Sequence, residues 1–327
     1  MSSTLDIIEG CSLCNRPITS HECQGCQVVS YCSPEHLHQH QPIHQEACDP
    51  ISRARRETEL YNLRDEDGNI ITPQEVDVRE RGWRFRSDNF RYAASRLGWV
   101  EALEHLHTRK ALEAQLEHLI EAAHLFQNDE ENKTGILRLL FRLGRHAEFY
   151  SLAKSRITAD WGQPLQSWVA TRENSSDPFE DSKWLLDNEF EIDTALLLLL
   201  LKVNMLHDLV ALNAAAVTAG PKVPQEILDH ICSYVLTTSI IANERKAFFG
   251  NENTEHIGKL RAQIKELYGV ISRKRPDAWN LVIGNKAGEL PEQATAPVNL
   301  GHIYSLDVWN ANRWAIEYIS KLRESCP

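Results

Sequence analysis

Residues 11–48 read CSLCNRPITSHECQGCQVVSYCSPEHLHQHQPIHQEAC, and the spacing of cysteine and histidine in this stretch decides the fold around it. The residues that can bind a metal ion are Cys11, Cys14, Cys23, Cys26, Cys32, His36, His44 and Cys48. A structural zinc ion takes four thiolate or imidazole ligands in a closed tetrahedron. Eight ligands therefore predict two filled zinc sites, and thus two Zn²⁺ ions per chain. No coordination position is then open for catalysis.

The other cysteines are few. The chain has 327 residues and 8 cysteines, of which only Cys232 and Cys326 lie beyond this stretch. Residues 1–10 have neither a basic start nor an apolar core, so we expect no signal peptide and no disulfide framework. Free cysteines together with zinc ligands favour a reducing compartment, which predicts the cytoplasm or the nucleus.

The spacing, together with Tyr31-Cys32-Ser33, resembles the MYND-type zinc finger, a cross-braced module that binds two zinc ions and serves protein–protein interaction. The resemblance covers residues 11–48. It implies one zinc site of Cys11, Cys14, Cys32 and His36, and a second of Cys23, Cys26, His44 and Cys48. So short a segment has little apolar surface to bury, so zinc must supply its folding energy, on the order of 10–16 kcal/mol per ion.

The sixth ligand departs from the family, which usually has cysteine where this chain has His36. His38 and His40 are competitors for the position. Ser33-Pro34 predicts a helix that begins at about Pro34, and His36, His40 and His44 then share one face of it. We expect His36 to be the ligand, because His40 would leave seven residues between it and Cys32.

The family's peptide-binding residues are also replaced. Members often carry Gln directly after the sixth ligand and Trp four residues later, and these contact proline-rich motifs. Here Leu37 and Gln41 occupy the two positions. We therefore regard Leu37 and Gln41 as candidate partner-binding residues for a changed ligand. The alternative is a finger that only clamps onto the rest of the chain.

Charge and hydropathy restrict the partners to other proteins, with peptide motifs among the candidates. Lys and Arg number 35 against 46 Asp and Glu, a net charge of −11. The first fifty residues carry one arginine, Arg16, among six carboxylates, so nucleic acid is an unlikely partner. The longest apolar run, residues 195–201, is far too short to span a bilayer, so we expect no membrane.

Behind the finger the apolar residues recur with helical period, for example Leu112, Leu116, Leu119 and Ala123. We predict a mostly α fold in which the small cross-braced two-zinc finger is followed by an all-α helical array. The predicted domains are the finger at 1–50, a charged connector at 51–88 with a turn at residues 65–69, and an α-helical domain at 89–327. The leucine run from Leu196 to Leu201 predicts a helix at the centre of that domain.

Residues 94–106 align with residues 140–152, and each copy carries Leu-Gly, at Gly98 and at Gly144. We expect each glycine to turn one helix back on the next. Two copies fit helical hairpins of the tetratricopeptide or HEAT kind, or a chance match. The body also resembles, more loosely, uncharacterised fungal MYND-finger proteins with a helical domain. Residues 158–182 predict an irregular loop whose function the sequence does not give.

Enzyme motifs are missing from the sequence. It has no His-x-Asp pair, Gly-rich phosphate loop or Gly-x-Ser-x-Gly turn, and we expect no methyltransferase half-domain before the finger. The leading hypothesis is an intracellular zinc-binding adaptor that mediates protein–protein interaction without catalysis. The alternatives are a lysine methyltransferase-like or other enzyme with an unread site, and a zinc-dependent transcription regulator.

Overall fold

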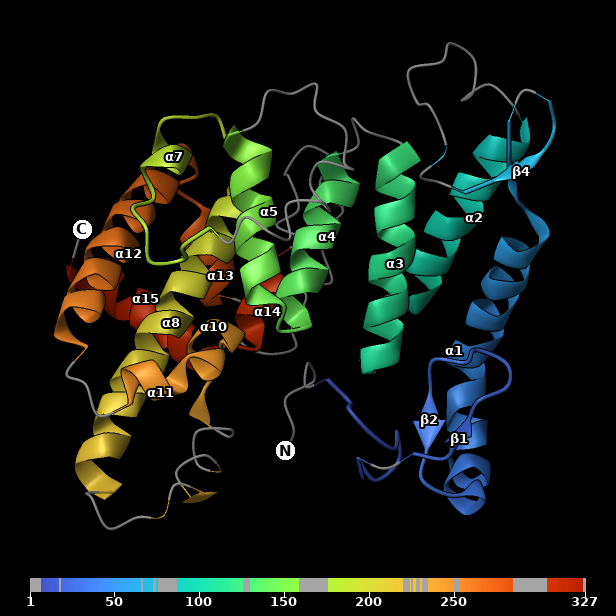
Figure 1. The fold of residues 1–327 in the computed structure, drawn as a ribbon, viewed down its shortest axis with the longest axis horizontal. Helices are drawn as coiled ribbons and strands as arrows, with labels where there is room; N and C mark the ends of the chain where they lie inside the picture. The colour runs from blue at the N-terminus through green and yellow to red at the C-terminus, as the bar shows by residue number, and fades with distance from the viewer. Residues whose placement is uncertain are drawn as a thin grey trace. The chain divides into compact units, whose positions relative to one another are not determined.

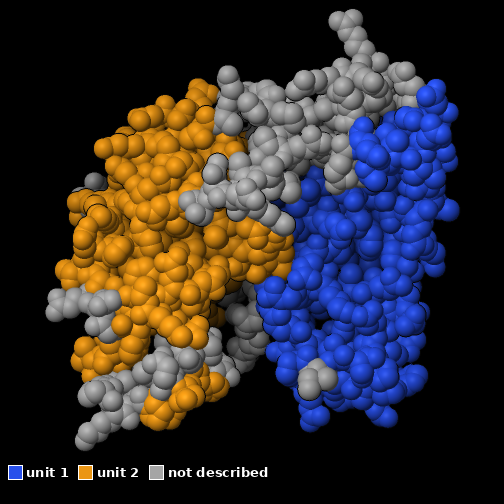
Figure 2. Space-filling model, viewed as in Figure 1, with its two compact units in different colours: residues 1–139, 164–169 blue, residues 140–163, 170–327 orange. Residues whose placement is uncertain are grey.

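The computed structural model describes residues 7–17, 19–65, 67–72, 75, 87–125, 130–158, 176–219, 224, 226–227, 230, 235–249, 253–284 and 305–325. The chain divides into two compact units (Figure 2). The first consists of residues 1–139 and 164–169, and the second of residues 140–163 and 170–327. The predicted domain limits at 50 and 88 fall inside helices of the first unit.

The first unit contains two short hairpins and the helices that follow them (Figure 1). Strands β1 and β2 pair His21 with Tyr31, and β3 and β4 pair Leu63 with Ile71. The elements are β1 (His21–Glu22), β2 (Ser30–Tyr31), α1 (Pro34–Leu60), β3 (Leu63–Arg64), β4 (Ile70–Ile71), α2 (Ser87–Leu103), α3 (Arg109–Leu125) and most of α4 (Glu130–Arg142).

Helix α1 begins where the sequence predicts. The Ser33 hydroxyl accepts a hydrogen bond from the backbone N–H of His36, and Pro34 occupies the first turn. The helix then continues for 27 residues through Pro42 and Pro50. Each internal proline removes a backbone hydrogen bond and crowds the preceding turn, at a cost of roughly 3 kcal/mol. Contacts outside the helix must offset that cost.

The finger and the α2–α3 pair share one hydrophobic core. Side chains from the finger lie against Leu103 at the end of α2 and Ala111 in α3. The Thr108 hydroxyl donates to the carbonyl of Val28 over 2.7 Å, and Ile8 forms a β-bridge with Thr108. The fully or nearly buried members of this core are Cys11, Cys26, Val28, Val29, Tyr31, Cys48, Ile51, Leu103 and Ala111. Within the first unit the finger is therefore a docked part of a larger core.

The second unit is built around α8, which carries the leucine run. Residues Ala195 to Leu201 are all buried, which confirms the predicted central helix. Helix α12 packs along it. The elements are α5 (His146–Thr158), α7 (Lys183–Leu186), α8 (Ile192–Ala219), α10 (Ser239–Asn243), α11 (Arg245–Phe248), α12 (Thr254–Lys274), α13 (Ala278–Gly284), α14 (Leu306–Asn310) and α15 (Arg313–Ser325). The mostly α fold is thereby confirmed.

By length and composition α8 would also suffice to cross a membrane, which no other helix in the described ranges does. Its most apolar window is, however, 83% buried inside the structure. The helix also contains Lys202 and Asp208, both almost fully buried. A mostly buried helix with such polar members is typical of a protein core.

Lys202 fixes the described end of the irregular segment 158–182. Its Nζ donates to the carbonyl oxygens of Pro178, over 2.5 Å, and Glu180, over 3.2 Å. Burial lowers the pKa of Lys202 to about 8. Gln263 of α12 donates to the same backbone at Phe179 and Glu180. Residues 178–180 are therefore held by side chains of the two central helices.

The two Leu-Gly sites behave differently. Gly144 has a φ of 71° and ends α4, and the N–H of Arg145 bonds back to the carbonyl of Leu140, as predicted. Gly98, in contrast, lies inside α2, so the predicted turn there is wrong. Trp99 and Leu103 continue the helix because they pack on the finger core. The helical-repeat interpretation stays a prediction.

The turn predicted at residues 65–69 is confirmed, and it joins β3 to β4 in a hairpin that the sequence did not reveal. The N–H of Asp65 bonds to the carbonyl of Asn69 over 3.0 Å, and Gly68 has a φ of 86°. Residues 159–175 of the predicted irregular loop lie outside the described residues.

Candidate metal centre

Two similar turns carry the first four cysteines. In the turn from Cys11 to Cys14, the N–H of Asn15 bonds to the carbonyl of Cys11 over 2.7 Å. In the turn from Cys23 to Cys26, the N–H of Gln27 bonds to the carbonyl of Cys23 over 2.9 Å. Asn15 and Gln27 both have positive φ, 55° and 62°. The two segments thus adopt the same local geometry with different sequences, and each places two sulfurs on one side of a turn.

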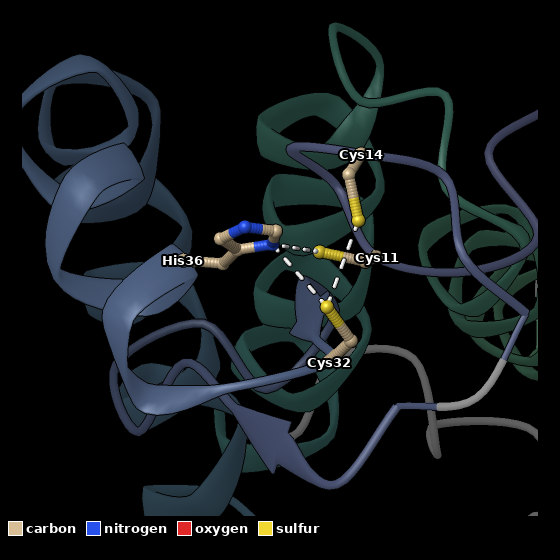
Figure 3. A group of neighbouring side chains, drawn as sticks. All are labelled: Cys11, Cys14, Cys32 and His36. Atoms are coloured by element: carbon tan, nitrogen blue, oxygen red, sulfur yellow. Dashed lines mark hydrogen bonds between the residues drawn. The ribbon is translucent and has the colours of Figure 1, made fainter.

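The first cluster joins one of these turns to the start of α1 (Figure 3). The Nδ1 atom of His36 lies 3.5 Å from the sulfur of Cys11 and 3.2 Å from that of Cys32. The sulfurs of Cys14 and Cys32 are 3.6 Å apart. All four donor atoms lie within 4.8 Å of one another.

The second cluster joins the other turn to the middle of α1. The sulfurs of Cys23 and Cys48 are 3.4 Å apart, and the Cys26 sulfur is 3.3 Å from Nε2 of His44. His44 and Cys48 are four residues apart in the helix, so they face the same side. Cys26, His44 and Cys48 are buried.

Both donor sets fit zinc. A tetrahedral ion with metal–sulfur distances of about 2.3 Å places its ligand atoms roughly 3.7 Å apart. The measured donor–donor distances of 3.2 to 3.6 Å are close to that value. Three sulfurs and one imidazole nitrogen in each set are the ligands of a closed structural site. The two clusters are consistent with two zinc ions, as predicted.

The geometry separates His36 from its competitors. His40 lies outside both clusters; its Nδ1 is 3.0 Å from the Tyr31 hydroxyl, and its ring stacks on His44 at 5.8 Å between centroids. His38 is exposed. Of the three histidines predicted to share a helix face, His36 thus belongs to the first cluster, His44 belongs to the second, and His40 stacks on His44.

Thiol acidity differs within each cluster. Burial raises the pKa of Cys11, but hydrogen bonds to the backbone of Cys32, Leu13 and Cys14 outweigh it, and the pKa falls to about 6. Burial raises the pKa of Cys26 to about 12. Metal binding requires thiolates. Desolvation raises the pKa of Cys32 to about 11, whereas hydrogen bonds, chiefly from the backbone of Cys26, lower the pKa of Cys23 against the effect of burial. Each cluster therefore contains a thiol whose thiolate is favoured by hydrogen bonds and a thiol that needs the charge of the metal ion.

Two glycines allow the close approach of these turns. A Cβ atom on Gly25 would lie 2.8 Å from the Cys48 sulfur and 2.6 Å from the Ser52 hydroxyl, which itself lies 3.4 Å from that sulfur. A Cβ atom on Gly10 would lie 2.0 Å from the carbonyl oxygen of Arg16. The sequence does not single out these glycines, because the atoms that would clash with a Cβ atom approach only in the folded structure.

A pocket of about 570 Å³ lies beside the second cluster, along α1. Both predicted partner-binding residues, Leu37 and Gln41, line it. Its lining residues are Cys23, Gln24, Gly25, Tyr31, Leu37, Gln41, His44, Gln45, Cys48, Asp49, Ser52, Arg53, Arg55 and Arg56. Nothing in the sequence alone singles out the three arginines. We call this pocket the α1 groove.

Comparison with known proteins agrees with the finger and adds nothing about the helices. No curated protein and no solved structure matches the chain. The resemblance of the helical body to fungal proteins therefore stays a prediction. Residues 11–48, the stretch that holds both clusters, match the family model of the MYND finger.

Proposed function

We propose that this chain is a zinc-binding adaptor whose α1 groove holds a peptide segment of another protein. The observation that carries the proposal is the groove itself, a pocket of about 570 Å³ on the finger whose lining includes Leu37 and Gln41. Pockets of about 300–1,000 Å³ are the usual size for ligand sites. The match to the MYND finger supports a role in protein interaction.

The lining offers the two kinds of contact that a peptide needs. Leu37 is half-buried and packs on the finger core, so it presents a fixed apolar surface. Gln41 and Gln45 are exposed one and two turns further along α1, and their amides can bond to a peptide backbone. Among the described residues that line the groove, none carries an indole. The proposed ligand is therefore an extended segment with an apolar anchor, without a requirement for proline.

Zinc is structural in this proposal. Each cluster supplies four ligands, so the ions fix the two turns and α1 and thereby shape the groove. We propose no catalysis, and we place the adaptor in the cytoplasm or the nucleus. A methyltransferase-like activity makes a distinct prediction, since S-adenosylmethionine would then raise the melting temperature of the full chain. Such a rise would contradict the proposal.

The decisive experiment pans a display library of random decapeptides against the full chain. We expect enrichment of peptides with a shared apolar position, and we expect Leu37→Ala with Gln41→Ala to abolish it. The matched control is Gln39→Ala with Ile43→Ala, because both residues are exposed on α1 and neither lines the groove. Elemental analysis should give two zinc ions for each protein. Enrichment that survives the first pair, or that the control removes equally, would overturn the proposal.

A further inference from the structure

The α1 groove changes character along its length. Near the start of α1, Leu37 is the aliphatic side chain that lines it. Near the end it is basic, with Arg53, Arg55 and Arg56. Asp49 is the single carboxylate that lines it. Nothing in the metal-binding role of the finger requires a basic end.

The three arginines are not equivalent. Arg55 belongs to the fold: its Nε donates to the carbonyl of Gly25 over 3.1 Å, and its Nη1 pairs with Glu59 at 2.7 Å. Arg53 and Arg56 are exposed, and within the part of the chain that the structure describes neither has a hydrogen bond or an ion pair. Two guanidinium groups at the groove's end are therefore available to a ligand.

The surroundings of the groove favour a short acidic segment over a long run of phosphates. A nucleic acid is bound mainly by neutralising successive phosphates with basic residues. The first fifty residues carry six carboxylates and one arginine, so the rest of the finger would repel a phosphate backbone. Two local guanidinium groups match a short acidic segment, and arginine pairs well with carboxylates.

From these observations we propose that the ligand of the α1 groove is an extended peptide that carries an apolar side chain at one end and Asp or Glu at the other. The apolar side chain lies at Leu37, and the carboxylates pair with Arg53 and Arg56. Leu37 and Arg56 are separated by about 28 Å of helix at 1.5 Å per residue. An extended peptide covers that length with about eight or nine residues at 3.3 Å each. The inference rests on the proposed adaptor function.

Sequencing of the decapeptides enriched by the full chain tests the proposal. We expect Asp and Glu to be over-represented near one end of the enriched peptides and the apolar anchor near the other. Arg53→Ala with Arg56→Ala should remove the acidic preference and keep the apolar one, whereas lysine at both positions should retain both. Arg16→Ala with Arg91→Ala is the charge-matched control, since both arginines are exposed and lie outside the groove.

A binding measurement on one peptide gives the size of the effect. The most enriched acidic decapeptide is compared with a copy in which every Asp and Glu is replaced by Asn or Gln. Exposed ion pairs are weak, so we expect the neutral copy to bind about five- to tenfold more weakly. The Arg53→Ala, Arg56→Ala protein should bind the two peptides equally. Raising the salt concentration should shrink the difference between the peptides on the wild-type protein.

The outcomes separate the inference from the function beneath it. Enriched peptides without acidic residues would overturn the inference and leave the adaptor function standing. An acidic preference that persists without Arg53 and Arg56 would do the same. No enrichment at all would overturn both. A 20-base-pair DNA duplex that binds the wild-type protein and not the double variant would assign the basic end to nucleic acid and overturn the peptide proposal.

Discussion

The finger and the helix α8 obtain their order from different sources. In the finger, eight ligands hold two turns and one helix, and the buried apolar residues around them belong to a core that α2 and α3 complete. In α8, a run of leucines buried on every side needs no metal. We therefore expect the folding of the finger to depend on zinc ions and the folding of α8 to depend on buried apolar surface.

Removing zinc should produce the largest difference in stability between the finger and α8. A chelator, or Cys23→Ser with Cys26→Ser, takes away stabilisation on the order of 10 kcal/mol per ion. We expect amide hydrogens of residues 21–48 to exchange rapidly while those of α8 stay protected. Hydrogen exchange followed by mass spectrometry measures both at once. Equal loss of protection in α8 would show that the two regions do not fold independently.

A cavity in α8 should produce the opposite pattern. Leu199 is fully buried, and Leu199→Ala should cost the second unit roughly 3–4 kcal/mol through lost burial and an unfilled space. Zinc content should remain at two ions per chain, because no ligand is altered. Val210→Ala, at a 44% exposed position of the same helix, is the control and should cost far less. A fall in zinc content with Leu199→Ala would contradict the separation.

Acid should also distinguish the regions. Burial lowers the pKa of His146 in the second unit to about 4, from 6.5, and its Nδ1 accepts a hydrogen bond from the N–H of Ser239. The folded state therefore favours the neutral ring. The neutral His146 ring contributes fully to the unfolding free energy above pH 6.5. This contribution, about 3 kcal/mol in total, is lost as the pH falls toward 4.

The unfolding free energy of the second unit, measured in denaturant by hydrogen exchange of the α8 amides, should show this loss between pH 7 and pH 4.5. His146→Gln removes the titrating ring, so its unfolding free energy should depend less steeply on pH over the same range. An unchanged slope in that variant would exclude His146 as the source. Zinc ligands also take up protons in acid, so the finger's amides must be followed separately.

The smallest expected effect concerns the turn after Cys26. Gln27 has a φ of 62°, a conformation that glycine adopts more readily than a residue with a Cβ atom. Gln27→Gly should therefore stabilise the finger by about 0.5–1 kcal/mol, a gain partly offset by the freer unfolded chain. Competition with a weak chelator would measure the change as tighter zinc retention. Weaker retention would mean that the glutamine side chain contributes contacts of its own.

The metal centre was the most predictable part of the molecule. Ligand spacing is a local property, and the structure brings together the predicted sets, with His36 rather than His40. The central position of α8 followed from its composition in the same way. Both signals come from residues whose chemistry leaves few alternatives.

Features that depend on tertiary contact were not predictable. Gly98 and Gly144 stand in the same Leu-Gly pair, yet only Gly144 ends a helix, because the residues after Gly98 pack on the finger. The basic end of the α1 groove was missed because arginines spaced along a helix usually face solvent. Their place in a groove becomes visible only in the folded structure, where the turn at Gly25 lines the same groove.

One continuous helix joins the ions to the rest of the first unit. Helix α1 starts among the ligands of the first cluster and runs to Leu60, and near its end Arg96 of α2 donates to the carbonyl of Thr58 over 2.6 Å. Pro42 and Pro50 destabilise this helix in isolation. Loss of zinc would therefore affect more than the ligands. It would weaken the packing of α2 on α1 and expose the apolar side of α2 to the cell's quality-control machinery.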